Sequence, residues 1–467
     1  MPDIYESTGP LPWLVCQQRR TRKWLHTWLG IDNAIGFTVL ARVWSSIAGL
    51  ITVGLIARFL SPAEQGYYYT FGSLIALQIV FELGFSFVIL QLATHERAHL
   101  TISSSGLVSG DPVAHARLAS VLQRTLRWYS IAAVLMAVFL LVEGSRFFSV
   151  HHHAGDGVSW HFAWYAASLA ATLTFQVDPI LSFMEGCGFV ANVARLRLGQ
   201  AVTGSTLAWL SLATHHGLFA PAMIMIGNAC VAFIWLSRRR HLLGALLQHP
   251  SGEHRIRWGK EVWPFQWRIA VSWLCGYFIF QLYNPVLFAF HGAIVAGQMG
   301  MSLTLANALQ AIAISWIYTK AAPFGALIAR KEYVQLDKLF FKALGQSVAV
   351  CITGALTIWI GVIYLNWAHL PFAHRLLDPT SIAFLLMLTT MNIIVFAEAT
   401  YLRAHKQEKL LLNSVLGAFL VAFSTFLLGR SYGALGVVTG SLIIGLVVGL
   451  PLGTYTFLRY RRIWHAQ

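Results

Sequence analysis

The chain has 467 residues, of which 57% are hydrophobic and only 11% are charged, whereas soluble domains carry roughly a quarter charged residues. A soluble fold of this length could not bury so much apolar surface, but a bilayer can solvate it. The formal net charge of +15 comes from short basic clusters between apolar stretches, a distribution that fits the positive-inside rule and excludes a nucleic-acid partner as its cause.

Twelve apolar stretches are long enough to cross the hydrocarbon core, which takes roughly 20 helical residues. We therefore expect an all-α polytopic membrane protein, with about twelve transmembrane helices in two six-helix lobes around a central cavity. The predicted helices cover residues 34–57, 67–93, 126–143, 161–184, 190–213, 217–236, 265–290, 298–319, 342–365, 380–401, 411–429 and 433–457.

The basic segment 237–262 separates the first six predicted helices from the last six. The beginnings of the two halves are similar, since Gln65-Gly66 leads into a helix with Ala76-Leu77-Gln78, and Gly297-Gln298 leads into one with Ala308-Leu309-Gln310. Halves of six helices each would be related by an axis along the membrane normal. The predicted units are an N-terminal segment 1–33, an N-lobe 34–236, a linker 237–262, a C-lobe 263–458 and a basic tail 459–467.

The positions of the basic residues predict the orientation of the helices. Of the 33 lysines and arginines, 27 fall in alternate connections and in the two termini, and Arg42 and Arg268 lie in or near predicted helices. Lysine and arginine gather on the cytoplasmic side. Both termini are therefore predicted to be cytoplasmic. The opposite side holds Arg58, Arg146, Arg375 and Arg430.

Arg42 and Arg268 lie near the predicted cytoplasmic ends of the helices that open the two halves. A charged side chain at the bilayer centre costs at least roughly 2.5–3.5 kcal/mol and needs a reason. One reason is functional, a pair of cations that contacts an anion at a cytoplasm-facing mouth. The other is that both side chains extend to the interface as anchors. Both interpretations remain open from the sequence.

Glu82 lies near the middle of the predicted second helix, and Gln78 precedes it by one turn on the same face. Glu82 is a candidate to carry a proton or pair with a cation, or else it is a structural acid bonded to a neighbouring helix. Asp178 precedes Pro179, and a proline inside a helix predicts a break that would expose backbone groups to a cavity.

Other polar residues in the second half are weaker candidates for the cavity. Glu398 lies near the end of the tenth predicted helix and is followed by basic residues that offer local ion pairs. Amide side chains on transmembrane helices more often join helices than bind substrate. The amide candidates are Asn284, in an interruption of the seventh predicted helix, and Asn307 and Gln310, three residues apart on the eighth.

No cofactor is expected from the sequence. The five cysteines include no CxxC pair, so neither a disulfide nor a zinc site is predicted. The run His151-His152-His153 has no acidic or cysteine partner in metal-ligand spacing, so no metal site is predicted. A GxxxxGK[ST] phosphate loop is absent from the sequence. Transport would then draw on a gradient of H⁺ or Na⁺.

Two short motifs resemble those of a known family. The run Ala57-Arg-Phe-Leu-Ser-Pro-Ala-Glu-Gln-Gly-Tyr67, followed by Phe81-Glu-Leu-Gly-Phe85, resembles the turn and the following "D-L-G" of Wzx-type polysaccharide-export proteins. Glu82 replaces the aspartate, Gln65 stands in a usually aromatic position, and Phe85 replaces a small residue. The resemblance extends over the whole chain and places it in the superfamily of multidrug, oligosaccharidyl-lipid and polysaccharide exporters.

The resemblance implies a flippase for an undecaprenyl-diphosphate-linked oligosaccharide, such as an O-antigen unit of lipopolysaccharide, in the bacterial inner membrane. Its expected partners are that substrate, membrane lipids and other polysaccharide-assembly proteins. Guanidinium groups bind phosphate through forked hydrogen bonds, which favours Arg42 and Arg268 as diphosphate contacts. A cation-coupled drug antiporter of the same superfamily is the alternative. A glycan polymerase or ligase is less favoured, because the longest predicted outer loop, 144–160, is small.

Overall fold

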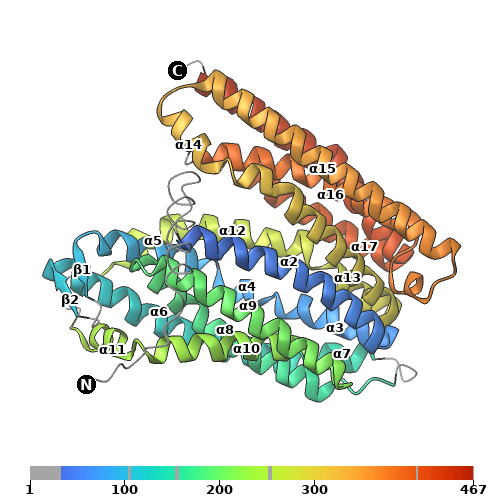
Figure 1. The fold of residues 1–467 in the computed structure, drawn as a ribbon, viewed down its shortest axis with the longest axis horizontal. Helices are drawn as coiled ribbons and strands as arrows, with labels where there is room; N and C mark the ends of the chain where they lie inside the picture. The colour runs from blue at the N-terminus through green and yellow to red at the C-terminus, as the bar shows by residue number, and fades with distance from the viewer. Residues whose placement is uncertain are drawn as a thin grey trace, which may run out of the picture.

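The computed structural model describes residues 33–103, 107–152, 157–250, 255–405, 407 and 409–465. Most of the helices run along the long axis of the molecule in two groups (Figure 1). The predicted N-terminal segment, Asp156 and His153 lie outside the described residues, apart from Asn33. The first group consists of α2 (Asn33–Phe59), α3 (Pro62–Ile75), α4 (Gln78–Glu82), α5 (Phe85–Arg97), α6 (Pro112–Phe139), α7 (Ser145–His151), α8 (His161–Gly186), α9 (Val190–Ala213) and α10 (Ala220–Ser237).

The second group follows a linker that contains α11 (Arg240–Gln248) and a π-helical turn, Trp258–Val262. We call these two groups the first and second lobes. The all-α membrane fold is confirmed, whereas the count of twelve spans is approximate and the bounds of the predicted lobes stay a prediction. The second lobe consists of α12 (Trp263–Phe280), α13 (Tyr283–Tyr318), α14 (Ala321–Ala329), α15 (Tyr333–Trp367), α16 (Pro379–Ala404), α17 (Leu411–Ile444) and α18 (Leu450–His465).

The number of separate apolar spans depends on how kinked helices are counted. Within the described residues, seven continuous helical stretches are long and apolar enough to cross a membrane, or eight if a bent pair counts as one span. Two of these stretches contain a glycine in the left-handed region, Gly292 at φ 83° and Gly433 at φ 61°. Because each stretch turns at its glycine, it supplies two of the predicted helices. α8 and α9 coincide with predicted helices but fall outside the seven.

The second predicted helix, 67–93, is not continuous, and this part of the prediction was wrong. Leu83 and Gly84 both adopt left-handed conformations, at φ 50° and 68°, so that α4 ends at Glu82 and α5 begins at Phe85. The chain bends by 45° there. The amide of Gln266, on α12, donates a hydrogen bond to the Leu83 carbonyl that the break leaves free. A partner from another helix therefore permits a break that local hydropathy does not indicate.

The break predicted at Pro179 is absent, because α8 runs unbroken from His161 to Gly186. A proline removes one backbone donor, and the surrounding helix retains its other bonds. Ser182 also donates its hydroxyl to the Asp178 carbonyl, at 3.3 Å. One proline is therefore accommodated inside this helix without ending it.

Two predicted connections contain regular structure of their own. The outer connection 144–160 begins as helix, since α6 continues through the π-helical turn Leu140–Gly144 into α7. The connection 94–125 contains an antiparallel pair, β1 (Leu100–Ile102) and β2 (Val108–Gly110), and then the first turns of α6. Hydropathy marks where the bilayer ends, whereas caps such as Asp111, which accepts from Val113 and Ala114, mark where a helix begins.

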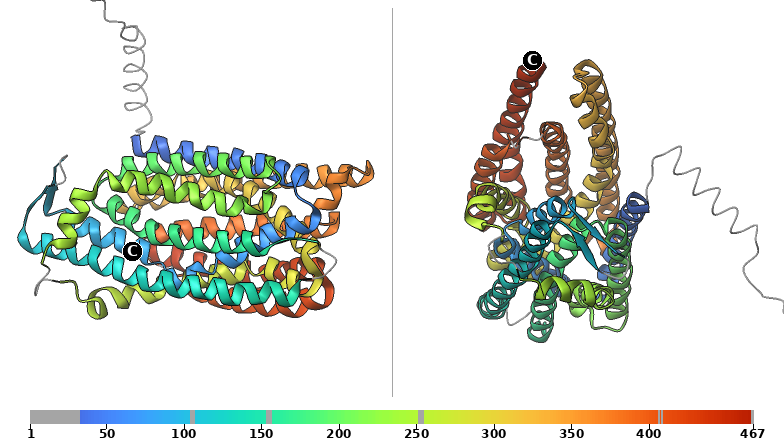
Figure 2. Two further views of the ribbon diagram at one scale, coloured as in Figure 1. Left: turned by 90° about the horizontal axis from the view of Figure 1, so that it is seen from below. Right: turned by 90° about the vertical axis from the view of Figure 1, so that its left-hand side faces the viewer.

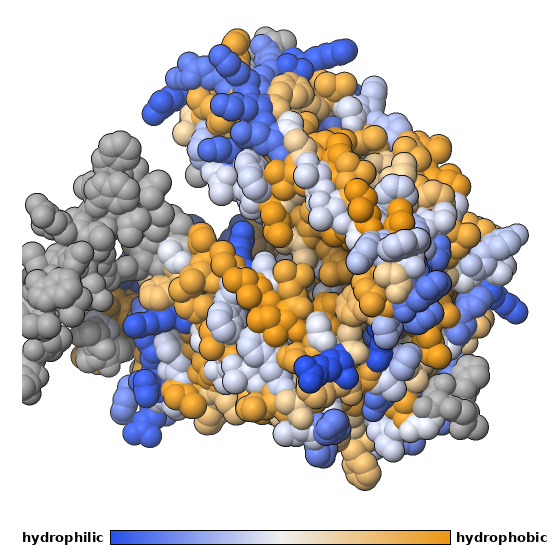
Figure 3. Space-filling view, turned by 45° about the vertical axis from the view of Figure 1, so that its right-hand side comes forward, coloured by the Kyte–Doolittle hydropathy of each residue, from blue (hydrophilic) through white to orange (hydrophobic). Residues whose placement is uncertain are grey.

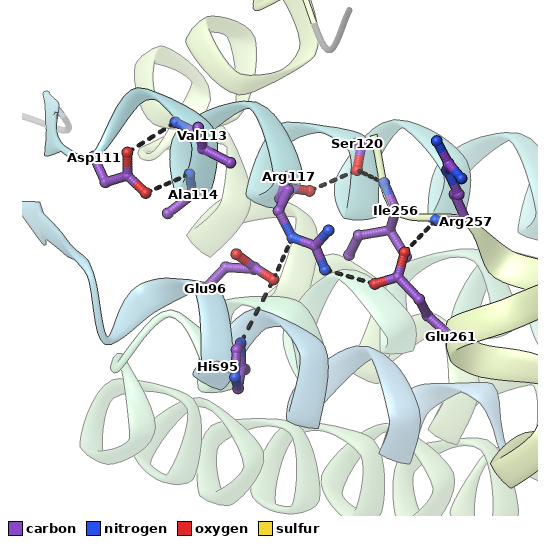
Figure 4. A network of polar contacts seen from close by, with 10 residues as sticks. All are labelled: His95, Glu96, Asp111, Val113, Ala114, Arg117, Ser120, Ile256, Arg257 and Glu261. Carbon is purple, nitrogen blue, oxygen red and sulfur yellow. Dashed lines mark hydrogen bonds and ion pairs between the residues drawn. The ribbon is translucent and has the colours of Figure 1, made fainter. Parts of the chain in front are cut away.

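The linker is attached to α6 of the first lobe by polar contacts (Figure 4). Arg117 donates to Glu96 at 2.8 Å and to Glu261 of the linker at 2.7 Å. The Ile256 amide donates to Ser120. Further along α6, the Gln123 amide donates to the carbonyls of Leu246, Leu247 and His249 and so caps the end of α11.

Acid should release this part of the linker. The Arg117 guanidinium and the Arg257 amide hold the pKa of Glu261 below its ordinary value. A depressed pKa contributes stability above the ordinary glutamate pKa, and that contribution is lost as the pH falls through the lower folded value. We expect hydrogen exchange of residues 255–262 to accelerate in that acidic range. Glu261→Gln should exchange fast at every pH, whereas a pH-dependent rise that persists in this variant would assign the effect to another group.

Candidate substrate site

The two lobes are joined at one end of the molecule by hydrogen bonds between residues far apart in sequence. The buried Gln65 amide donates to the carbonyls of Gly297 at 2.8 Å and Arg375 at 3.0 Å. The Arg375 guanidinium donates to the Leu60 carbonyl at 2.6 Å and to Gln65 Oε1 at 3.3 Å. Deeper in the same interface, the Asn284 amide donates to the Ser73 hydroxyl at 3.1 Å. These contacts close this end, which we call the joined end.

The backbones of α3 and α13 touch at two glycines in the joined end. A Cβ atom at Gly297 would lie 2.9 Å from the Gly66 nitrogen, and one at Gly66 would overlap the Ala293 carbonyl. Tyr67 packs its ring against Phe288 of α13, with centroids 4.9 Å apart. Only glycine permits this approach. The similar segments of the two halves thus meet face to face.

Apart from α12, which stays packed against the first lobe, the second lobe separates from the first toward the other end, where α5, α10, α13 and α18 end. At that end, the start of α15 and the end of α16 lie away from α2 and α12 (Figures 1 and 2). The space-filling view shows a hollow between the lobes (Figure 3). We call this the basic end, because its described residues include Arg97, Arg238, Arg239, Arg240, Lys320, Lys331, Arg403, Arg459 and Arg462.

A cavity of about 250 Å³, with a mostly apolar wall that several polar side chains interrupt, lies inside the second lobe between α12, α13, α16 and α17. Predicted candidates Asn307 and Gln310 both line it. Arg403, on α16, places a cation in its wall. Amide and hydroxyl groups with a guanidinium suit a ligand that carries hydroxyl groups and negative charge. The remaining polar lining residues are Ser272, Thr389, Asn392, Asn413, Ser414 and Ser441.

Glu398 is buried beside this cavity with one oxygen unsatisfied. Its Oε1 accepts from the Thr454 hydroxyl at 2.8 Å, and its Oε2 has no hydrogen-bond partner among the described residues. A Cβ atom at Gly453 would lie 3.4 Å from Glu398 Oε2 and 3.4 Å from Asn413 Nδ2. Gly453 thus keeps a small space open between two polar groups. A lone carboxylate in such a space requires a proton or another cation.

A second polar cluster lies on the first lobe, where Asp178 of α8 is exposed and Glu82 of α4 is half-buried. Glu82 and Asp178 are close enough to interact electrostatically, and both interact with Tyr129 of α6. The Tyr129 hydroxyl and Ser86 are hydrogen bonded at 3.2 Å. Arg197, on α9, interacts with Asp178 and pairs with Glu185 at 3.1 Å. Two acids that the sequence separates by almost a hundred residues therefore share one environment.

A crevice of about 450 Å³ lies between the first lobe and α13. Arg197, Gln200 and Asn228 line it from α9 and α10, and Thr304 lines it from α13. Asn228 Oδ1 and the Tyr69 hydroxyl have no partner within the part of the chain that is described. These residues carry no signal in the sequence, because each amide by itself resembles a helix-joining residue.

The predicted cations lie apart from both cavities. Arg42 is exposed on α2, and Arg268 is exposed on α12, with its guanidinium carbon 5.5 Å from the centre of the Trp267 ring. Neither lines the second-lobe cavity or the crevice. Gln78 begins the short helix α4 beside Glu82, and Asn284 serves the lobe interface rather than a cavity.

Comparison with known proteins identifies the fold. No protein-family model matches the sequence, and no curated protein matches it. Among solved structures, a multidrug resistance MATE family transporter of the MOP superfamily in an inward-facing conformation aligns with a TM-score of 0.59 and 13% identity, over 91% of this chain and 99% of that chain. The MATE multidrug transporter DinF-BH aligns with a TM-score of 0.58 and 13% identity, over 92% and 96%.

A lipid flippase has the same fold. The lipid II flippase MurJ, in an inward closed conformation, aligns with a TM-score of 0.56 and 13% identity, over 92% of this chain and 90% of that chain. The chain thus has the fold of MOP-superfamily transporters, the multidrug, oligosaccharidyl-lipid and polysaccharide exporters. The neighbours include both drug transporters and a lipid flippase, so the fold leaves the substrate to be argued from the cavities.

Proposed function

We propose that this protein is a flippase, without enzymatic activity, that moves an undecaprenyl-diphosphate-linked oligosaccharide across the bacterial inner membrane by alternating access. The observation that carries the proposal is the pair of ends: direct hydrogen bonds and glycine contacts join the lobes at one end, and α15 and α16 of the second lobe stand apart from the first lobe at the basic end. A negatively charged headgroup would enter where basic residues gather. The choice of a glycan-linked substrate rests on the resemblance of the segment around Gly66 to Wzx-type motifs.

The lining of the second-lobe cavity favours a glycan over a drug cation. Asn307, Gln310 and Asn392 offer amide groups suited to sugar hydroxyls, and Arg403 would repel a cationic drug. The acids Glu82, Asp178 and Glu398 favour the alternative, a cation-coupled antiporter. We assign these acids instead to coupling with H⁺ or Na⁺. The two functions are separated by measuring drug accumulation in cells that lack this protein, before and after it is expressed. Unchanged accumulation would exclude the drug antiporter.

The proposed orientation places the basic end and both termini in the cytoplasm. Reporter fusions at Arg239 and after the last residue should have cytoplasmic activity, and a fusion at Asp156 should have periplasmic activity. The reason is the excess of lysine and arginine at one end of the helices. A periplasmic signal at Arg239 would reverse the transport direction that we propose.

Arg42→Ala and Arg268→Ala are expected to weaken capture of the lipid diphosphate. Each charge-assisted hydrogen bond contributes roughly 1.5–3 kcal/mol, so each loss should reduce glycan export on the order of tenfold to a hundredfold. Lysine at either position keeps the positive charge but cannot form the forked pair of hydrogen bonds, so each Arg→Lys variant should export at an intermediate level. Export is measured by complementation of a strain that lacks the protein, with membrane abundance followed by immunoblot.

The exposed Arg146 provides the matched control, because it lies in the connection at the joined end and pairs only loosely with Glu143, at 4.0 Å. Arg146→Ala should export normally. Normal export by both Arg42→Ala and Arg268→Ala at wild-type abundance would make them interfacial anchors. The cationic contact would then fall to Arg403 in the cavity wall.

A further inference from the structure

A small cavity of about 220 Å³ lies apart from the proposed transport cavities, where the first lobe, the linker and the second lobe meet. Trp128 and Arg124 contribute to it from α6, Trp258 from the linker, and Trp263 and Gln266 from α12. The break between α4 and α5 forms its floor at Leu83. Sites for drug-sized ligands measure roughly 300–1,000 Å³. This cavity therefore suits a headgroup rather than an oligosaccharide.

Gln266 identifies one chemical property of the ligand. The side chain is fully buried, and its amide nitrogen donates to the Leu83 carbonyl. Its oxygen has no hydrogen-bond partner among the described residues. A buried acceptor without a partner is unfavourable. A hydrogen-bond donor on a ligand in this cavity would satisfy the Gln266 oxygen.

The walls indicate that the donor is a cation. The Phe85 ring lies between those of Trp128 and Trp258, with ring centroids 5.5 and 5.6 Å away and the ring planes tilted by 32° and 33°. Trp263 is 57% exposed at the rim. Indole faces attract ammonium groups, and tryptophan favours the membrane interface. Arg124, also exposed at the rim, would repel a simple cation but would bind a neighbouring phosphate.

We propose that this cavity binds the headgroup of a phosphatidylethanolamine lipid. The ammonium would donate to Gln266 Oε1 among the indole rings, and the phosphate would contact Arg124. Choline lacks an N–H donor and would leave Gln266 unsatisfied, while glycerol lacks the cation that indoles attract. Because the walls come from both lobes and the linker, the bound lipid would hold these three parts together.

The test uses the purified full chain in nanodiscs of phosphatidylcholine with increasing fractions of phosphatidylethanolamine or phosphatidylglycerol. Thermal unfolding should shift upward with ethanolamine lipid in a saturable way. Arg124→Ala and Gln266→Met should raise the half-saturating lipid fraction about tenfold. Arg127→Ala, an exposed arginine on the same helix outside the cavity, should behave as wild type. If Gln266→Met fails to fold, Trp263→Phe at the rim replaces it and should likewise raise the half-saturating lipid fraction.

An unfolding temperature that stays at its value in pure phosphatidylcholine as ethanolamine lipid is added would overturn the proposal, because phosphatidylcholine cannot donate to Gln266. Equal stabilisation by phosphatidylglycerol that still requires Arg124 would replace the zwitterion with a simple phosphate ligand. Soluble glycerophosphoethanolamine should compete weakly, since it lacks the acyl chains. Displacement of the ethanolamine lipid by an isoprenyl diphosphate would instead make the cavity part of the transport site.

Discussion

Gly66→Val should abolish export and leave the lobes unable to close at the joined end. Even the first carbon of a side chain at Gly66 would overlap the Ala293 carbonyl, which is backbone and cannot rotate away. α3 and α13 would have to separate there, and the bonds of Gln65 to Gly297 and Arg375 would break. We expect a loss of export of at least a hundredfold. Spin-label distances across the joined end should increase.

Gly72→Val is the matched control for this substitution. Gly72 lies on the same helix, six residues further on, and a Cβ atom there would meet nothing within 4 Å. The control should export at the wild-type level with unchanged distances. Wild-type distances in Gly66→Val would show that the joined end is not a tight contact in the membrane. Gln65→Ala, which removes the bonds without adding bulk, should widen the joined end to a smaller extent.

Glu398→Gln should remove the dependence of export on the ion gradient. The carboxyl has one oxygen on Thr454 and one facing a space that Asn413 shares. In a surrounding of low dielectric constant, a proton or Na⁺ at this oxygen offsets the cost of the charge. Glutamine keeps the shape and the Thr454 bond but cannot take up a cation. Export measured in vesicles with imposed H⁺ or Na⁺ gradients should lose its response to one of them.

Glu82→Gln tests whether the first-lobe cluster shares this role, and Glu143→Gln tests for a general effect of losing an acid. Glu143 has half of its side-chain surface exposed and should be neutral. An unchanged gradient response in Glu398→Gln, together with a lost response in Glu82→Gln, would place coupling at the Glu82 and Asp178 pair. Unchanged responses in both variants would make the two acids structural.

Part of the candidate site was predicted from the sequence. Asn307 and Gln310, three apart on one helix face, do line the second-lobe cavity. Glu398 was expected to form a local ion pair, but its partner is the Thr454 hydroxyl, on α18. The break after Glu82 had a weak signal in Gly84, but one glycine inside an apolar stretch does not distinguish a kink from a continuous helix. Gln65 was visible as a departure from the family turn, without any sign that it joins the lobes.

The sequence by itself determined the membrane class and the positions of most of the apolar helices. These are properties of single residues added over short windows, and the bilayer responds to them directly. Only the tertiary structure decided which polar groups meet. Gln65 reaches Arg375 because helix rotation and tilt bring the two side chains together. That geometry depends on contacts such as Gly66 against Gly297, whose closeness no single stretch of sequence specifies.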